Sequence, residues 1–229
     1  MIHQPEPPDD ALGDLSRADP VLARLIEAHP GFDPRAWLND LPPMDAFGVL
    51  VFQVVGQQLS VRATRRILDR LAAKFGGALP TPAQLLAVDP SDLAAVGLSR
   101  RKVATMRDVA QRFADGRLRE QELRSLSDRE VEERLTAVPG IGPWTVHGFL
   151  IIAFDRKDVV LPGDLALRNA IQQVYEMDRL PSEAEVIELA ERWRPWRSIA
   201  VAYLFQAGLE AGSGSRSARA GRQTDGTSA

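Results

Sequence analysis

The sequence predicts an all-α protein of about ten helices, on the strength of three observations. Apolar residues recur at spacings of three and four along most of the 229-residue chain. Helix-capping signals precede several of these stretches, and glycine pairs or Asp-Gly follow them. Alternating strand patterns are nearly absent, because the one β-like run, residues 158–161, is too short to start a sheet. The length suits one domain or two small lobes with a real core.

The first half of the chain contains three strong helix patterns. An apolar stripe over residues 44–55 predicts the first helix. A second stripe, over residues 67–75, predicts another helix, which the Gly76-Gly77 pair ends. The third helix is expected to begin at Ser99 and to end near Phe113, before an Asp-Gly pair.

The second half is punctuated by capping signals. Residues 127–130 and 182–185 each spell S-x-x-E, the sequence of a capping box, so a helix is expected to open at each. Residues 146–154 are almost entirely apolar, which predicts a largely buried helix. Pro195 breaks the helix that precedes it, and residues 199–209 predict one more.

The composition excludes several classes of protein. The chain has no cysteine, which excludes disulfides, thiolate nucleophiles and iron–sulfur clusters. No apolar run approaches the roughly 18 residues of a membrane span, and the acidic, proline-rich N-terminus is unlike a signal peptide. We therefore expect a soluble, cytoplasmic protein with no membrane partner. Residues 1–17 and 211–229 are predicted to be disordered, because they offer little to bury.

The net charge of −3 argues at first against a nucleic-acid partner. However, residues 1–45 hold nine acidic side chains and only three arginines, so residues 46–210 carry a net charge of only +1. Residues 99–102 form the densest basic cluster outside the C-terminal tail. That cluster is either a solvated helix face or a group that steers phosphates, and the sequence leaves both interpretations open.

The segment Leu135–Val146 carries the most specific pattern, LTAVPGIGPWTV. A capped helix ends, a tight Pro-Gly-Ile-Gly turn follows over residues 139–142, and a second helix begins with proline in its first turn. Two glycines permit left-handed backbone angles and a close approach of the backbone to another molecule. Backbone amides beside a helix N-terminus suit a phosphate group. The alternative is an ordinary turn between two helices, with glycines for geometry alone.

About twenty residues later, residues 161–164 spell Leu-Pro-Gly-Asp, a bend followed by an aspartate at a helix start. Judged from spacing alone, Asp164 is a helix N-cap, because aspartate is among the favoured capping residues.

Taken together, four motifs resemble the helix–hairpin–helix DNA glycosylase superfamily, and within it the DNA-3-methyladenine glycosylase II (AlkA-like) branch. The motifs are residues 55–61, 135–145, 161–164 and 192–198, and the resemblance covers roughly residues 18–210. It implies two helical lobes flanking a cleft, with residues 18–45 and 159–210 in one lobe. Residues 46–158 form the other, with the hairpin motif at 128–154. The chain resembles the compact form of the family, without its N-terminal α/β domain.

The resemblance also implies a reaction. Asp164 becomes the catalytic carboxylate, stabilising positive charge on the sugar while water attacks. Bifunctional relatives carry a Schiff-base lysine where this chain has Trp144, so a monofunctional glycosylase is expected. Its substrates would be alkylated bases of the 3-methyladenine and 7-methylguanine type, and its product an abasic site. The alternatives are a bifunctional glycosylase and lyase, or a non-enzymatic DNA-binding module. No organic cofactor is expected.

The resemblance also implies the remaining site residues and the partner, which is double-stranded DNA containing a damaged base. We expect a monomer that is associated with the nucleoid through this DNA. The base pocket would contain Trp144, Phe205, Gly148 and Phe47. DNA would be bound by Gln57, Gln58, Leu59, Ser60, Gly140, Gly142 and Thr145. Gln58 matches the family's wedge position, which is typically apolar, so Leu59 is the alternative wedge. Backbone carbonyls of Thr136, Val138 and Ile141 would hold a monovalent cation, Na⁺ or K⁺.

Overall fold

The computed structural model describes residues 9–34, 36 and 43–221, except for the side chains of Asp9, Val61 and residues 211–221. Helices and connecting turns make up this part of the chain, and it contains no strand. The chain divides into two compact units. Unit 1 is Asp40–Arg156, and unit 2 joins Ile2–Asn39 to Lys157–Ala229. The all-α class that the sequence predicts is therefore confirmed.

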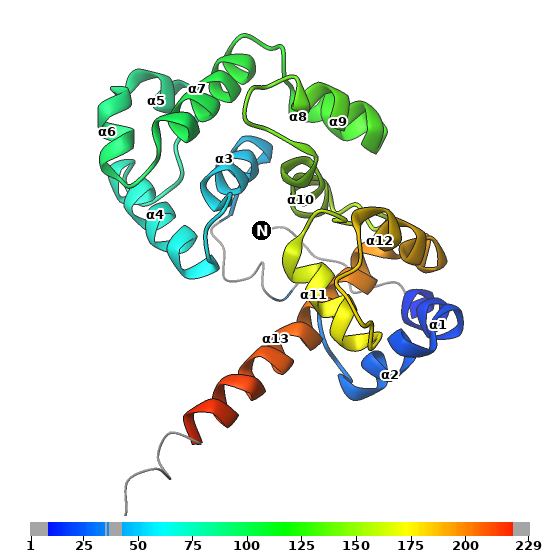
Figure 1. Cartoon of the computed structure of the whole chain (residues 1–229). Coiled ribbons are helices and arrows are strands. Elements are labelled where there is room, and N and C mark those ends of the chain that lie inside the picture. Colours follow the sequence, from blue (N-terminus) through cyan, green and yellow to red (C-terminus); the bar gives the residue numbers. More distant parts are fainter. Residues whose placement is uncertain (1–8, 35, 37–42, 222–229) are drawn as a thin grey trace, which may run out of the picture. The chain divides into compact units, whose positions relative to one another are not determined.

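Unit 1 contains eight helices among its described residues, coloured from cyan to yellow-green in Figure 1. They are α3 (Ala46–Gly56), α4 (Val61–Lys74), α5 (Pro82–Ala87), α6 (Pro90–Ala95), α7 (Arg100–Ala114), α8 (Glu120–Ser125), α9 (Asp128–Thr136) and α10 (Pro143–Phe154).

The centre of unit 1 is α3, which packs against α4, α7 and α10. Nearly all of its side chains are buried, in agreement with an apolar composition that leaves no polar face. Around this core, α5 and α6 pack on α7, and α9 packs on α10. The hairpin between α9 and α10 is thereby fixed at one end of the central helix.

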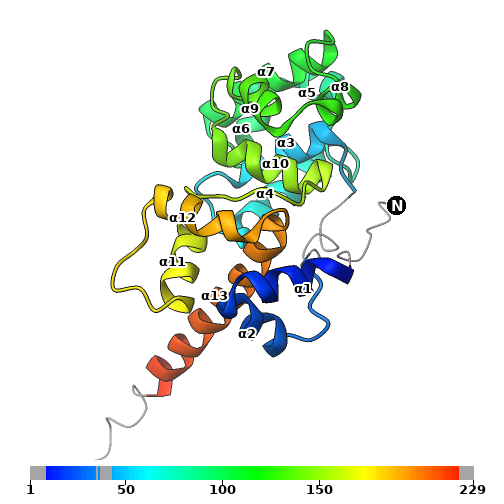
Figure 2. The same cartoon turned by 90° about the vertical axis from the view of Figure 1, so that its right-hand side faces the viewer.

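Unit 2 contains α1 (Asp9–Ala18), α2 (Pro20–Ala28), α11 (Leu165–Val174), α12 (Glu183–Ala190), the short 3₁₀ helix η2 (Glu191–Trp193) and α13 (Arg197–Gly221). Helix α13 packs against α11 and α2, and α1 packs against α2 (Figure 2). A Cβ atom on Gly208 would lie 3.0 Å from the Cβ of Ala170, so the glycine lets α13 approach α11 closely.

A buried carboxylate in unit 2 joins the N-terminal segment of the chain to its C-terminal segment. Asp19 is fully buried and caps α2 by accepting hydrogen bonds from the backbone N–H groups of Val21 and Leu22. Its second oxygen accepts from the Tyr175 hydroxyl at 2.7 Å and from the Trp193 indole at 3.0 Å. Because a buried charge is stable only when it is hydrogen-bonded, this network fixes α2 against η2 and the end of α11.

The local helix signals are confirmed. Ser99 caps α7, and both predicted capping boxes, at Ser127 and Ser182, form with their glutamates. The number of helices is larger than expected, with thirteen α-helices and one 3₁₀ helix in the elements that the structure describes. The difference arises from six-residue helices such as α5 and α6, which are too short to show a periodic pattern.

The predicted terminal segments need correction. Residues 9–18 form α1, although the sequence predicts disorder through residue 17, because Ala11 and Leu15 stand one turn apart and are both buried. Helix α13 runs to Gly221, beyond the tail boundary at residue 211, because extending an existing helix costs far less than starting one. Residues 1–8 and 222–229 lie outside the described residues.

Candidate functional site

The hairpin, Pro139–Gly142, depends on Gly140. Its φ is +93°, and a Cβ atom there would lie 2.2 Å from the hydroxyl oxygen of Thr105 on α7. The same hydroxyl donates a hydrogen bond to the Pro139 carbonyl at 2.9 Å. Position 140 therefore requires glycine for two reasons: the backbone is left-handed, and a side chain would clash with Thr105 on α7.

Gly142 uses only one of the two properties that the sequence suggests for these glycines. Its φ is −113°, so of the two only Gly140 lies in the left-handed region. A Cβ atom on Gly142 would meet nothing within 4 Å. Gly142 is the N-cap of α10, and no side chain caps this helix end. Its open surroundings leave the backbone accessible, which suits the close approach of an anion to a helix N-terminus.

The loop after α3, residues 57–60, is fastened to the hairpin and is called the wedge loop below. The side-chain nitrogen of Gln57 donates to the Gly140 carbonyl at 2.9 Å and to the Thr145 hydroxyl at 3.0 Å. Three of the residues predicted to bind DNA thus lie together in unit 1. The amide nitrogen of Gln57 and the hydroxyl of Thr145 hold the protein's own loops in place.

Lys102 fastens the same loop from the other side. Its ammonium group donates to the carbonyls of Val55 and Gln57, both at 2.8 Å, at the C-terminal end of α3. Cations are favourable at this end of a helix, where carbonyls have no helical partner. Burial lowers the pKa of Lys102 from its ordinary value. In the predicted basic cluster, Lys102 therefore stabilises the wedge loop, while Arg100 and Arg101 are exposed.

The wedge loop presents an exposed tip. Gln58 has a φ of +56°, which is uncommon for a residue with a side chain, and it is exposed. Leu59 is 40% exposed, which few large apolar side chains are among the described residues. Ser60 caps α4 by accepting a hydrogen bond from the Ala63 N–H. A strained, exposed tip on a braced loop is typical of a functional position.

The predicted pocket residues lie in different surroundings. Trp144 and Phe205 are half-buried, on α10 and α13 respectively. Gly148 is buried against the side chain of Gln53 on α3. Phe47 is 2% exposed and packs edge-to-face on Phe113, with ring centroids 5.6 Å apart. Phe47 is therefore a core residue of unit 1, and we remove it from the candidate pocket.

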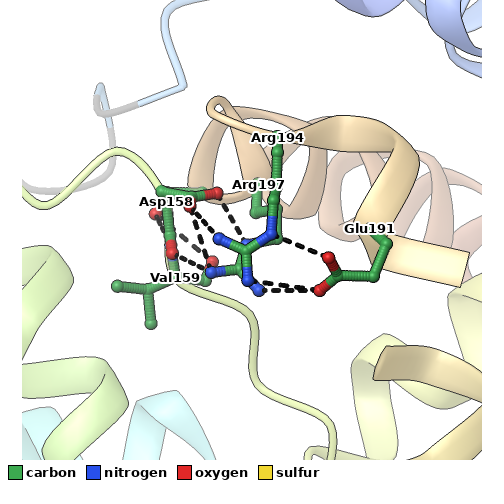
Figure 3. Close-up of polar contacts among 6 residues, drawn as sticks. Asp158, Val159, Glu191, Arg194 and Arg197 are labelled. Carbon is green, nitrogen blue, oxygen red and sulfur yellow. Dashed lines mark hydrogen bonds and ion pairs between the residues drawn. The ribbon is translucent and has the colours of Figure 1, made fainter. Parts of the chain in front are cut away.

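The segment Lys157–Asp164 in unit 2, called the Asp164 arm below, is anchored by an ion-pair cluster (Figure 3). The Asp158 carboxylate accepts hydrogen bonds from the guanidinium groups of Arg197 at 2.6 Å and Arg194 at 2.5 Å. Arg194 also binds Glu191, with which Arg197 forms a longer ion pair of 3.6 Å. Arg197 donates in addition to the Asp158 carbonyl at 2.6 Å.

Ser198 extends this anchor along the arm. The Ser198 hydroxyl accepts a hydrogen bond from the Val159 N–H at 3.1 Å, and the backbone N–H of Ser198 donates to the Lys157 carbonyl. The motif at residues 192–198, which the sequence shows only as a resemblance, thus holds the arm against the start of α13. The indole of Trp196 donates to Asp14 on α1. The anchor was missed in the sequence because its two halves lie about forty residues apart.

Asp164 lies at the end of the arm. Leu161–Asp164 forms a turn closed by a hydrogen bond from the Asp164 N–H to the Leu161 carbonyl at 3.0 Å. Asp164 is the N-cap of α11, and its Oδ1 accepts a hydrogen bond from the Leu167 N–H at 2.9 Å. The capping role that the spacing predicts is confirmed. A half-buried carboxylate that caps a helix N-terminus is held in one orientation.

This combination of hairpin, wedge loop and capped aspartate can be compared with known proteins. Residues 51–195 match the family described as HhH-GPD superfamily base excision DNA repair protein, and this match covers more than half of the chain. The chain belongs to the HhH-GPD superfamily. The family resemblance that the sequence motifs carry is thereby confirmed, and the hairpin at residues 139–142 is the turn of its helix–hairpin–helix motif.

Relatives of this superfamily member carry consistent names. DNA-3-methyladenine glycosylase 1 of Schizosaccharomyces pombe is 30% identical over 194 residues, covering 84% of each chain. DNA-3-methyladenine glycosylase 2 of Escherichia coli is 30% identical over 81% of this chain and 64% of its own length. The solved S. pombe 3-methyladenine DNA glycosylase (Mag1) in complex with abasic DNA superposes with a TM-score of 0.78 at 28% identity. That match covers 86% of this chain and 95% of Mag1.

Three features are absent from the HhH-GPD chain or from its described residues. None of the described helices combines the length and hydropathy that a membrane crossing requires. Among the same residues, no cluster of three or more histidine or acidic side chains could hold a metal ion. With no cysteine in the sequence, the iron–sulfur cluster of some DNA-repair enzymes has no ligands here.

Proposed function

We propose that this chain is a monofunctional DNA glycosylase that removes alkylated bases from double-stranded DNA and leaves an abasic site. The observation that carries the proposal is the oriented carboxylate of Asp164, at the N-cap of α11 within the matched family region. The names of the S. pombe and E. coli relatives, and the abasic DNA bound by Mag1, support the same activity and partner.

The chemistry assigned to Asp164 is electrostatic. Breaking the bond between base and deoxyribose develops positive charge on the sugar, and a fixed anion nearby lowers the energy of that state. The hydrogen bond from Leu167 to Oδ1 holds the carboxylate before the charge develops, so little reorganisation is needed. The same carboxylate orients or deprotonates the attacking water.

The monofunctional class follows from position 144. A glycosylase that also cleaves the strand needs an amine to form an imine with the sugar. This chain has Trp144 where such relatives carry the lysine. In unit 1 the Lys102 ammonium is already bound to two backbone carbonyls. Water is therefore the nucleophile, and a strand cut by the enzyme is not expected.

DNA binding is assigned to the hairpin and the wedge loop. The uncapped N-terminus of α10 at Gly142 offers backbone amides to a phosphate. The exposed tip, Gln58 with Leu59, fills the space that the extruded base leaves in the duplex. Trp144 and Phe205 are assigned to the pocket, because an aromatic face attracts a cationic alkylated purine. Binding DNA in this way would keep the protein at the nucleoid.

A monovalent cation at the hairpin belongs to the proposal as well. The carbonyls of Thr136, Val138 and Ile141 are the candidate ligands, and oxygen donors of this kind suit Na⁺ or K⁺. The Val138 carbonyl already accepts a hydrogen bond from the Ile141 N–H at 3.0 Å, which leaves one lone pair for an ion.

The test is base release from methylated duplex DNA by the wild-type protein. We expect free 3-methyladenine or 7-methylguanine together with intact abasic strands, which break only after alkali treatment. Borohydride should trap no covalent adduct. An adduct would indicate the bifunctional alternative, and binding of abasic DNA without any base release would indicate a DNA-binding module that has lost catalysis.

A further inference from the structure

Gln53 stands out in α3 as a polar side chain among apolar ones. It lies one helical turn before Gln57 and is only 5% exposed. Gln57 uses its side-chain amide to hold the hairpin, whereas the amide of Gln53 has no hydrogen-bond partner among the described residues. An amide that is buried without a partner destabilises a fold, so its presence in a helix core needs an explanation.

Gly148 on α10 makes room for this amide. A Cβ atom on Gly148 would lie 2.3 Å from the side-chain nitrogen of Gln53 and 2.9 Å from its oxygen. Any larger residue at position 148 would displace the whole amide group. Trp144 lies four residues earlier in α10, on the same helix face and roughly 6 Å away along it. The Gln53 amide is thus placed beside the face that carries the candidate base-stacking indole.

The amide is also not sealed from solvent. Side-chain nitrogen and oxygen atoms that are fully shielded from solvent and lack a hydrogen bond form a separate class among the described residues. The nitrogen and oxygen of Gln53 are not in that class although they lack partners, so each keeps a small solvent-accessible area. A nearly buried amide that keeps a small accessible area and has no partner in the chain is suited to bind a polar group that enters from outside.

We infer that Gln53 is a specificity-determining residue that hydrogen-bonds the edge of the extruded base, an inference that rests on the proposed glycosylase function. A carboxamide presents a donor beside an acceptor, which matches the N6 donor and N7 acceptor of adenine. Both groups are free in 3-methyladenine, whereas methylation blocks N7 in 7-methylguanine. Gln53 therefore favours 3-methyladenine.

The test is the shape-preserving substitution Gln53→Met, assayed on both lesions. We expect kcat/KM for 3-methyladenine release to fall about tenfold, the value of one lost hydrogen bond, and that for 7-methylguanine to fall less than about threefold. The urea midpoint should stay equal or rise, because an unpaired amide leaves the core. Gln121→Met, the same change on the exposed face of α8, should alter neither rate nor midpoint.

Unchanged 3-methyladenine release by Gln53→Met, or an equal loss on both lesions, would overturn the inference and make Gln53 a packing residue. A wild-type protein that releases neither base would instead refute the proposed glycosylase function. If the variant does not fold, the wild type still decides: the side-chain amide NMR signal of Gln53 should shift when free 3-methyladenine is added. An unshifted signal at saturating free base contradicts the inference.

Discussion

Gly140 and Gly142 stand two residues apart in the hairpin and have different physical reasons to be glycine. Gly140 combines a φ of +93° with contact against the Thr105 hydroxyl, so the fold requires it. Gly142 has an ordinary φ and empty space where a side chain would point. At this scale the hairpin contains one glycine for structure and one whose missing side chain leaves room for a ligand.

This difference predicts opposite outcomes for the same substitution. Gly140→Ala should lower the free energy of unfolding by about 2–3 kcal/mol, because it forces a left-handed alanine against Thr105. Gly142→Ala should change that free energy by less than about 0.5 kcal/mol but weaken binding of abasic duplex DNA. Urea unfolding and fluorescence anisotropy measure the two quantities. Equal effects of the two variants on stability would contradict this account of the hairpin.

At the scale of the element, unit 2 is held together by contacts between segments far apart in the sequence. Asp158 binds Arg194 and Arg197, which ties the Asp164 arm to the start of α13. Further along α13, His29 at the end of α2 binds Glu210. The first contact orients a proposed catalytic segment, and the second closes α2 onto α13.

Removing the charge of Asp158 should loosen the arm. We expect Asp158→Asn to lower the free energy of unfolding by about 1–3 kcal/mol, because Arg197 is left nearly buried without its carboxylate. Base release should slow, since Asp164 lies at the end of the same segment, while abasic-DNA binding by the hairpin is kept. Glu133→Gln is the control, because it removes an exposed ion pair with Arg129 on α9 and should change neither measurement.

The contact between His29 and Glu210 predicts a pH dependence with a definite sign. A hydrogen bond to the Leu25 carbonyl and then one to Glu210 raise the pKa of His29 above its ordinary 6.5. The contribution of the imidazolium is therefore complete below about pH 6.5 and is lost as the pH rises through the raised value. Between pH 6 and 8.5 the wild type should lose on the order of a degree or two in Tm relative to His29→Gln. If the Tm of the wild type instead rises relative to that of His29→Gln between pH 6 and 8.5, this assignment is contradicted.

For the whole molecule, the net charge of −3 is compatible with DNA binding because few of the proposed DNA contacts use charged side chains. The hairpin offers backbone amides, and Lys102 is occupied within the protein. We expect exposed arginines such as Arg62 and Arg66 on α4, next to the wedge loop, to supply a few phosphate contacts.

The salt dependence of binding should therefore be shallow. For undamaged duplex DNA, the slope of log K against log salt should correspond to about three to five phosphates. Changing both Arg62 and Arg66 to alanine should reduce that slope by about one each. A wild-type slope that corresponds to about eight or more ion contacts would contradict this, because charged side chains would then dominate DNA binding.

What could be predicted from the sequence depends on how local the signal is. Helix starts at Ser99, Ser127 and Ser182 are encoded within four residues, so they were predictable. The contacts of Thr105 with Pro139 and of Lys102 with Gln57 join residues 34 and 45 positions apart, and no local pattern reports such pairs. The candidate site shows the same division: its motifs are visible in the sequence, whereas the side chains that brace them are not.

We propose that the charge of Asp164, rather than its capping role, drives base release. Asparagine caps helices about as well as aspartate, so Asp164→Asn keeps the bond to Leu167 and removes only the anion. Release of 3-methyladenine from methylated duplex DNA by this variant is the decisive measurement. We predict a loss of about 10²-fold to 10³-fold or more, with unchanged binding of abasic DNA and unchanged stability. Release at the wild-type rate would contradict it.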